Sequence, residues 1–258
     1  MAQRWEAAAV TISADSPEAR VVIARPTWSF ALEALLDDSE RERLAWLHRE
    51  VDRRRFVAAH ALARLVLSQV TGQPATTLKF ETECGRCGGH HGKMRLATAQ
   101  QMHFGMTHAE ERVAVAVTAL GPVGVDLEPA KAGGFGGFAN VALTPRERAK
   151  YEQLPIEQRP RAATTWWVRK EAVLKATGHG MFVSPEDVEI SEPAEEPRLV
   201  AWNAKDETTA PVQLTDLRLG LDYVGCVAVL SHRRPLIRLI DGSGLLATWA
   251  TWVRTTTR

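Results

Sequence analysis

The chain has 258 residues, of which 45% are hydrophobic, and its 32 lysines and arginines nearly balance its 31 aspartates and glutamates. This composition is ordinary for a globular protein and excludes the strong basic excess that marks most nucleic-acid binders. The longest charge-free apolar run, Val113–Val125, is too short to span a membrane, and three cysteines make no disulfide framework. We therefore expect a cytoplasmic protein of one large or two small domains, without nucleic-acid or membrane partners.

The first half of the chain contains signals for two consecutive helices. We expect the first to begin near Ser39, because residues 39–42 (SERE) fit a capping box, with a hydroxyl at the N-cap and a carboxylate at N3. The second helix should follow almost at once, since apolar residues recur at helical spacing over Phe56–Val70 and Gly72 ends the pattern. The glycine-rich stretch Cys84–Lys93 is predicted to be a loop.

Two strands, 112–118 and 123–128, are predicted next, joined as a hairpin through Ala119–Pro122. A glycine-rich loop over Lys131–Asn140 should lead into a helix with Thr144 at its N-cap. The remaining expected elements are a long helix over 161–177, a surface loop over 191–198, and strands at 188–190, 213–219 and 223–230. Helices and hairpins without regular βαβ alternation indicate an α+β fold, with a boundary near Gly121–Pro122.

The sequence Gly124-Val-Asp-Leu-Glu128 is the strongest chemical signal. Side chains alternate along a strand, so Asp126 and Glu128 should share one face while Val125 and Leu127 occupy the other. Two neighbouring carboxylates repel unless a cation or water separates them, and oxygen ligands suit Mg²⁺. A solvent-facing pair on an edge strand, without a role, explains the pattern equally well.

A second signal lies in the long helix, where Glu171 and Lys175 are four residues apart and share one face. The carboxylate could complete a metal site and the lysine could hold a phosphate, but a plain surface salt bridge is the simpler explanation. We expect Trp166 and Trp167 to be core residues.

Three weaker signals remain. Thr107 and His108 can both donate to a phosphate, and Arg53 opens a basic cluster (RRR) with His60 two turns later. A zinc site from Cys84, Cys87, His90 and His91 stays open, although no second ligand pair follows them.

In combination these segments resemble the Sfp-type 4′-phosphopantetheinyl transferases. The resemblance rests on four blocks in order: RRRFVAAHALARLVL (53–67), HGKMRL (91–96) leading to FGMTH (104–108), GVDLE (124–128) and WWVRKEAVLKATGHG (166–180). It implies two similar α/β halves in a pseudo-twofold arrangement, residues 1–121 with coenzyme A contacts and residues 122–258 with the metal carboxylates and catalytic helix. It further implies a monomer that transfers the phosphopantetheine arm of coenzyme A to a serine of an acyl, peptidyl or polyketide carrier protein, with adenosine 3′,5′-bisphosphate as the other product.

The resemblance also implies roles for individual residues. Mg²⁺ would be held by Asp126, Glu128 and Glu171, and the catalytic set would comprise Glu171, Lys175 and, as a candidate base, Glu147. Glu147 also suits a purely structural role as the N3 residue of a capping box. The implied coenzyme A contacts are Arg53, His60, Lys93, Met94, Thr107, His108, Asp126, Lys170 and Lys175.

The chain departs from the family pattern at three positions. Ala109 stands where a second hydroxyl is common, Met94 where proline is common, and His60 where arginine is common. The histidine makes the hold on the 3′-phosphate dependent on pH. The alternative functions are a non-catalytic module that binds coenzyme A or a carrier protein, and a zinc protein built around Cys84 and Cys87. For carrier docking we expect the loop Lys131–Lys150, with Phe138 as its test position.

Overall fold

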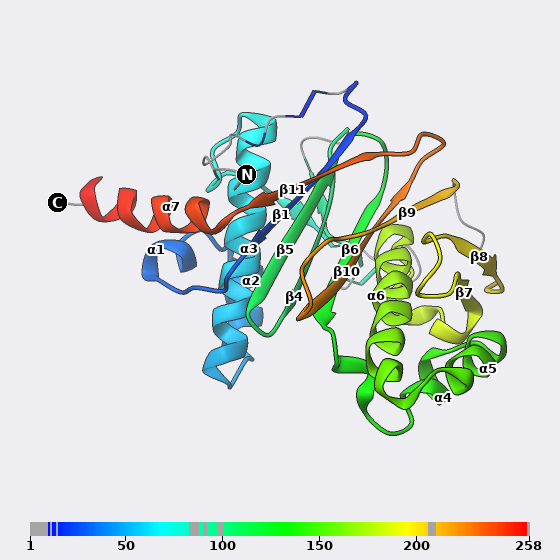
Figure 1. The fold of residues 1–258 in the computed structure, drawn as a ribbon. Coiled ribbons are helices and arrows are strands. Elements are labelled where there is room, and N and C mark those ends of the chain that lie inside the picture. The colour runs from blue at the N-terminus through cyan, green and yellow to red at the C-terminus, as the bar shows by residue number, and fades with distance from the viewer. Residues whose placement is uncertain are drawn as a thin grey trace, which may run out of the picture.

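A computed structural model of the chain describes residues 10, 12–13, 15–82, 88–89, 92–97, 101–205 and 210–256. It contains two lobes, each with a sheet and one long helix packed against it, and the two sheets meet in the middle of the molecule (Figure 1). The predicted α+β class is therefore confirmed.

The first lobe is built on a four-stranded sheet in the order β11-β1-β5-β4. Its strands are β1 (Glu18–Ala24), β4 (His103–Ala109), β5 (Arg112–Thr118) and β11 (Leu236–Asp241), with a separate small hairpin of β2 (Phe80–Glu81) and β3 (Arg95–Leu96). Its helices are α1 (Phe30–Glu33), α2 (Asp38–Ala45), α3 (Glu50–Thr71) and α7 (Ser243–Thr256).

The second lobe has a three-stranded sheet in the order β6-β10-β9 and a two-stranded sheet of β7 and β8. These strands are β6 (Val123–Pro129), β7 (Val188–Ile190), β8 (Leu199–Trp202), β9 (Val212–Asp216) and β10 (Tyr223–Leu230). The helices are α4 (Phe138–Ala142), α5 (Pro145–Gln153) and α6 (Arg159–Thr177), with 3-10 turns η1 (Ala132–Gly134), η2 (Ile156–Gln158), η3 (Gly180–Phe182) and η4 (Pro185–Asp187).

Strand β5 explains how the lobes are joined. Its valines at 113, 115 and 117 pack into the core beneath α3, whereas Ala114 and Ala116 face the other way and pack against Val125 and Leu127 of β6. Small residues on that face allow the two sheets to approach closely. Since the apolar side of β6 makes this contact, its opposite side, which carries Asp126 and Glu128, faces α6.

Three local predictions are corrected by the structure. Helix α2 begins two residues early, because Asp37 is its N-cap and Glu40, not Glu42, closes the capping box. The strands at 112–118 and 123–128 form no hairpin, since β5 pairs with β1 and β4 while β6 pairs with β10. The observed hairpin is β4–β5, closed by Glu110 and Glu111. The loop predicted over 131–140 contains η1 and the start of α4.

The end of the chain returns to the first lobe. Strand β11 pairs in parallel with β1, and α7 packs beside α1 and α3 (Figure 1). No local pattern in the sequence predicts this crossing. No helix within the described ranges has the length and apolar character needed to cross a membrane.

Candidate active site

A pocket of about 370 Å³ lies between the two lobes, at the junction of α3, β4, β6 and α6. We call it the acid pocket. It is lined by Phe56, Ala59, His60, Met106, Thr107, His108, Asp126, Glu128, Trp167, Glu171 and Lys175. Thus seven of the residues predicted from the sequence, from four separated segments, share one cavity.

The close contact between β6 and α6 brings the acidic residues together. A Cβ atom on Gly124 would collide with the backbone of Ala172 and Ala176, so only glycine allows the strand to lie this near the helix. Asp126 and Glu128, on the same face of β6 as Gly124, consequently point toward Glu171 and Lys175.

Asp126 is the centre of the polar network. It is buried, and its Oδ1 accepts hydrogen bonds from Lys175 Nζ at 2.6 Å and Thr107 Oγ1 at 2.9 Å. Its Oδ2 is buried without a hydrogen-bond partner among the described residues. Lys175 therefore does not form the helical salt bridge with Glu171 that its spacing suggested, and the solvent-facing alternative for Asp126 is wrong. A buried carboxylate oxygen without a partner costs free energy unless a ligand completes it.

The other two carboxyl groups are also poorly compensated. Desolvation, followed by the charge of Asp126, raises the pKa of Glu128 to about 7. Desolvation likewise raises the pKa of Glu171, against the opposing effect of Lys175. Three carboxyl groups in one cavity with one lysine leave an excess of negative charge, which favours a bound cation.

Mg²⁺ fits this donor set because it binds through one or two carboxylates together with substrate phosphates and water. The unpartnered Asp126 Oδ2 is the structural observation in favour. Within the described ranges, no three His, Cys, Asp or Glu side chains converge closely enough to coordinate one ion by themselves. The metal role of Asp126, Glu128 and Glu171 thus remains a prediction.

Two histidines line the opposite wall. Partial desolvation, with the nearby charges of Lys175 and Arg55, lowers the pKa of His108. His60 is buried, stacks on the ring of Phe56 at 4.0 Å, and places its Nδ1 2.7 Å from Glu40 Oε1. Both rings are close enough to the pocket to meet an anionic ligand.

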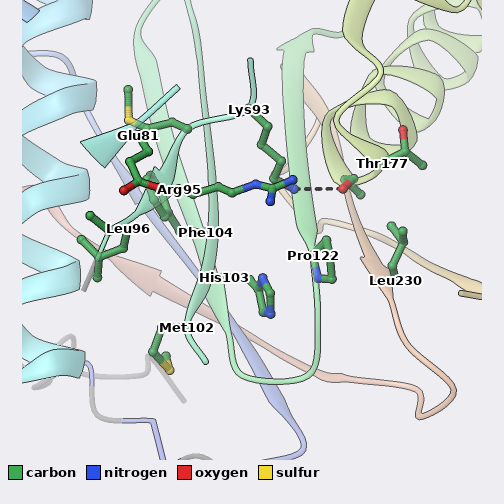
Figure 2. A pocket seen from close by; sticks show the side chains of 13 residues that line it. Glu81, Lys93, Arg95, Leu96, Met102, His103, Phe104, Pro122, Thr177 and Leu230 are labelled. Carbon is green, nitrogen blue, oxygen red and sulfur yellow. Dashed lines mark hydrogen bonds between the residues drawn. The ribbon is translucent and has the colours of Figure 1, made fainter. Parts of the chain in front are cut away.

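Lys93 and Met94 line a second pocket of about 570 Å³, which we call the lysine pocket (Figure 2). Lys93 Nζ donates to Val123 O at 2.8 Å and to Ala176 O at 2.9 Å. Desolvation, with a smaller contribution from Arg95, lowers the pKa of Lys93 to about 7. This pocket is larger than the acid pocket, but its described lining residues include no comparable cluster of carboxylates, so we propose that the chemistry takes place in the acid pocket.

Three predicted residues lie outside both pockets and have structural partners. Arg53 donates to Leu44 O at 2.8 Å, at the end of α2. Glu147 and Lys170 form a buried ion pair, and Lys170 also donates to two backbone carbonyls. Because neither side chain of this pair reaches the acid pocket, we do not keep Glu147 as a candidate base or Lys170 as a phosphate ligand.

Sequence reasoning missed several wall residues. Trp167, expected in the core with Trp166, is half-buried and lines the acid pocket, whereas Trp166 is fully buried. Glu40 belongs to the residues that predict a capping box, and no local pattern predicts its contact with His60. The zinc candidates Cys84, Cys87, His90 and His91 lie outside the described residues.

Comparison with known proteins adds independent information. Residues 122–227 match the family model of the 4′-phosphopantetheinyl transferase superfamily. The chain is 29% identical over 180 residues to the 4′-phosphopantetheinyl transferase HetI of Nostoc sp., covering 67% of this chain and 73% of that protein. It is 28% identical over 136 residues to the 4′-phosphopantetheinyl transferase psf-1 of Bacillus pumilus, covering 51% and 53% of the two chains. The chain thus spans about half the length of this second relative.

Among solved structures, a holo-[acyl-carrier-protein] synthase from Thermotoga maritima matches with a TM-score of 0.33 and 27% identity. The match covers 44% of this chain and 64% of that chain.

Proposed function

We propose that this chain, whose residues 122–227 match the family model of the 4′-phosphopantetheinyl transferase superfamily, moves the 4′-phosphopantetheine group of coenzyme A to a serine of a carrier protein. The acceptor is an apo acyl, peptidyl or polyketide carrier protein, and the second product is adenosine 3′,5′-bisphosphate. The observation that carries this proposal is the convergence of Asp126, Glu128, Glu171 and Lys175 in one pocket.

The reaction builds negative charge on the diphosphate as the serine oxygen attacks and the nucleotide leaves, so positioning and charge stabilisation are the main requirements. We assign the contacts with the diphosphate to Lys175 and His108, which both line the acid pocket. Asp126, Glu128 and Glu171 would hold Mg²⁺, which when bound supplies further positive charge to the phosphate oxygens. Glu171, whose pKa is raised by desolvation, is the candidate acceptor for the serine proton because it lines the pocket and Glu147 does not.

We assign the adenine end of coenzyme A to the lysine pocket, as the resemblance of Lys93 and Met94 to the family segment implies. Strand β4 supports this arrangement, because it contributes His103 and Phe104 to the lysine pocket and Thr107 and His108 to the acid pocket. A ligand lying along β4 could therefore contact both pockets.

The carrier protein is proposed to dock on the segment between β6 and α5. Phe135 is 60% exposed and packs edge-on against Phe138, which in turn contacts Trp167 of the acid pocket. Phe138 itself is buried, so the prediction that it is the surface contact is corrected to Phe135. Arg146, at the start of α5, is an exposed cation whose guanidinium lies 3.7 Å from Glu189, and a positive charge near the docking segment suits an acidic partner.

The docking surface can be tested with matched variants. Phe135→Ala should raise the carrier KM without changing coenzyme A binding. Phe30→Ala is the control, because Phe30 is also exposed but lies on α1 in the other lobe (Figure 1). Equal carrier KM values in the two variants would move the docking surface elsewhere.

The activity is tested by incubating the protein with an apo carrier protein, coenzyme A and Mg²⁺, followed by intact mass measurement of the carrier. We expect the mass gain of one phosphopantetheine group. Binding of coenzyme A without modification of any carrier would instead favour the non-catalytic binding module. A monomeric state is part of the proposal, since both walls of the acid pocket come from one chain.

A further inference from the structure

Another cavity, of about 320 Å³, lies where the second lobe meets one end of the first-lobe sheet. We call it the basic pocket, because three arginines line it: Arg25 directly after β1, Arg112 at the start of β5, and Arg218 in the connection between β9 and β10. Among its described lining residues Asp241, at the end of β11, is the only acid. The proposed reaction uses none of these residues.

Strand pairing brings two of the arginines together. Strands β1 and β5 are antiparallel, and the register between them ends with Ala24 opposite Val113. Arg25 and Arg112 are the next residue along each strand, so they lie beside each other at the end of the sheet. Side chains at opposing positions project from the same face, and like charges in that arrangement repel each other. The backbone therefore holds two guanidinium groups close together at an energetic cost.

No acidic side chain of the protein offsets this charge. In the part of the chain that the structure describes, none of the three arginines forms an ion pair. Arg112 donates to the backbone oxygen of Glu111 at 3.0 Å, and its guanidinium carbon lies 5.3 Å from the centre of the Tyr223 ring. Three positive charges with a single carboxylate in the same cavity favour a bound anion.

The carboxylate of Asp241 is already engaged. Its Oδ1 accepts a hydrogen bond at 2.8 Å from the N–H of Ser243, the first residue of α7. Ser243 also lines the basic pocket, so the positive end of the α7 helix dipole adds to the potential of the arginines. Asp241 thus caps the helix and leaves the guanidinium groups available to a ligand.

The opposite wall of the basic pocket is aliphatic. Ile23 lies across from Asp241 in the parallel pairing of β1 with β11, and Leu239 is two residues before Asp241, on the same face of β11. Leu219 completes this wall from the second lobe. Leu239 is 36% exposed, whereas Ile23 and Leu219 are partly buried. Since a phosphate ion is much smaller than the cavity, the aliphatic wall leaves room for an organic group attached to the anion.

We propose that the basic pocket binds a small organic phosphate, with its phosphate oxygens on Arg25, Arg112 and Arg218 and its organic group against the aliphatic wall. The planar guanidinium fork matches the spacing of phosphate oxygens, and a phosphate monoester offers three acceptor oxygens and nearly two negative charges. Because Arg218 comes from the second lobe, the bound ligand also joins the two lobes. This site is separate from the acid pocket and does not depend on the proposed transferase reaction.

The first test follows the arginine Nε–H signals of the full chain by NMR at about pH 7.5, where phosphate monoesters are dianionic. The probes are phenyl phosphate, inorganic phosphate and benzoate at constant ionic strength. Phenyl phosphate should shift the signals of Arg25, Arg112 and Arg218. It should bind at least about tenfold more tightly than benzoate, which has two oxygens and one charge, and about fivefold more tightly than inorganic phosphate, which lacks the apolar group.

Two results of this titration would overturn the proposal. Unchanged signals of the three arginines would remove the site, and equal affinities for the three probes would remove the organic phosphate as its ligand.

The second test uses matched variants. Arg25→Gln and Arg218→Gln should each weaken phenyl phosphate binding at least about tenfold, because each removes a charged hydrogen-bond donor. Arg233→Gln is the control, since it removes the same charge from an exposed position in the connection between β10 and β11, before the start of β11. The acid pocket is intact in all three variants, so phosphate bound there does not contribute to the difference. An equal loss in Arg233→Gln would reduce the effect to overall charge and overturn the site.

Thermal unfolding separates a ligand site from a structural role of the arginines. Since Arg25 and Arg112 repel each other, ligand-free Arg25→Gln should have a melting temperature equal to or above that of wild type. Phenyl phosphate at about ten times its Kd should raise the melting temperature of wild type but not of Arg25→Gln. A lower melting temperature in the ligand-free variant would mean that Arg25 is already compensated, and it would overturn the proposal.

Carrier modification should be the same in wild type, Arg25→Gln and Arg218→Gln. Loss of phenyl phosphate binding with normal carrier modification is the expected result for a separate site. Absence of carrier modification in all of these proteins would count against the proposed function and leave the basic pocket standing. A parallel loss of both activities in the two variants would place the arginines in the transferase site and overturn the separate pocket.

Discussion

Helix α6 carries two lysines that each meet a carboxylate, and the two ion pairs differ in how completely their hydrogen bonds are satisfied. Lys170 is fully buried and donates to Glu147 and to the carbonyls of Ala142 and Pro185. Glu147 in turn accepts from the backbone of Thr144 and Ile190. We call Lys170 and Glu147 the closed pair, because each of their polar groups has a partner. The closed pair can anchor α5 to α6 but cannot bind a ligand.

The open pair, Lys175 with Asp126, has a spare oxygen and lies beside a cavity. The Lys175 side chain is 33% exposed, and Asp126 Oδ2 has no hydrogen-bond partner in the part of the chain that the structure describes. The two lysine–carboxylate pairs of α6 therefore differ in one feature. Only the open pair has unused hydrogen-bonding capacity with which to bind a ligand.

The largest expected effect comes from breaking the closed pair. Glu147→Ala leaves a fully buried lysine without its carboxylate, so the free energy of unfolding should fall by about 3–5 kcal/mol. Denaturant unfolding measures this, and the double variant Glu147→Ala, Lys170→Met should recover part of the loss. A change as small as that of a surface substitution would mean that the pair is not structural.

Breaking the open pair should affect chemistry instead of stability. Asp126→Asn keeps an acceptor for Lys175 and Thr107 but removes the charge, so carrier modification should fall at least about 100-fold while the free energy of unfolding changes by less than about 1 kcal/mol. Rates come from intact mass and stability from denaturant titration. Near-normal transfer would contradict the metal-binding role of Asp126.

Lys93 sharpens the comparison because, among the described residues, its Nζ donates only to carbonyl oxygens, those of Val123 and Ala176. Its pKa is about 7 in the folded chain against an ordinary value of 10.5, so between these values the unfolded state binds more protons. Stability should then rise with pH in this window, by up to about 1.4 kcal/mol per pH unit. Lys93→Met should lack this rise and the exposed Lys79→Met should keep it, as unfolding curves between about pH 7 and about pH 9 would show.

The smallest effect is expected at Thr107, which supports the open pair from β4. Its hydroxyl donates to Asp126 Oδ1 and accepts from Lys175 at 3.2 Å. Thr107→Val removes both bonds without changing size, so kcat/KM should fall about fivefold, corresponding to about 1 kcal/mol. Thr107→Ser should retain the wild-type value, and a loss in both variants would assign the effect to packing.

Much of the acid pocket could be predicted because its residues follow simple periodicities. Alternation in β6 placed Asp126 and Glu128 on one face, and helical spacing placed Glu171 and Lys175 together. The pairing of Lys175 with Asp126 could not be predicted from the local sequence, because it depends on Gly124 allowing β6 to approach α6. The contact of Glu40 with His60 likewise joins residues 20 positions apart on different helices.

The fold was less predictable wherever strand pairing crosses long stretches of sequence. The β4–β5 hairpin turns through Glu110 and Glu111, without the glycine or asparagine that usually marks such a turn, and Glu110 adopts a φ of 44° there. The sequence pattern therefore favours a hairpin through Ala119–Pro122, between β5 and β6, over the hairpin that is observed between β4 and β5. Helix α6 and strand β10 carried strong local patterns and were placed within two residues of their observed ends.

The parallel pairing of β11 with β1 joins residues separated by more than two hundred positions. During translation the N-terminal sheet remains incomplete, because the edge of β1 that pairs with β11 has no partner until residues 236–241 have left the ribosome. A protein built in this order spends most of its synthesis with an unprotected strand edge, and it should depend on chaperones more than a chain whose sheets close locally.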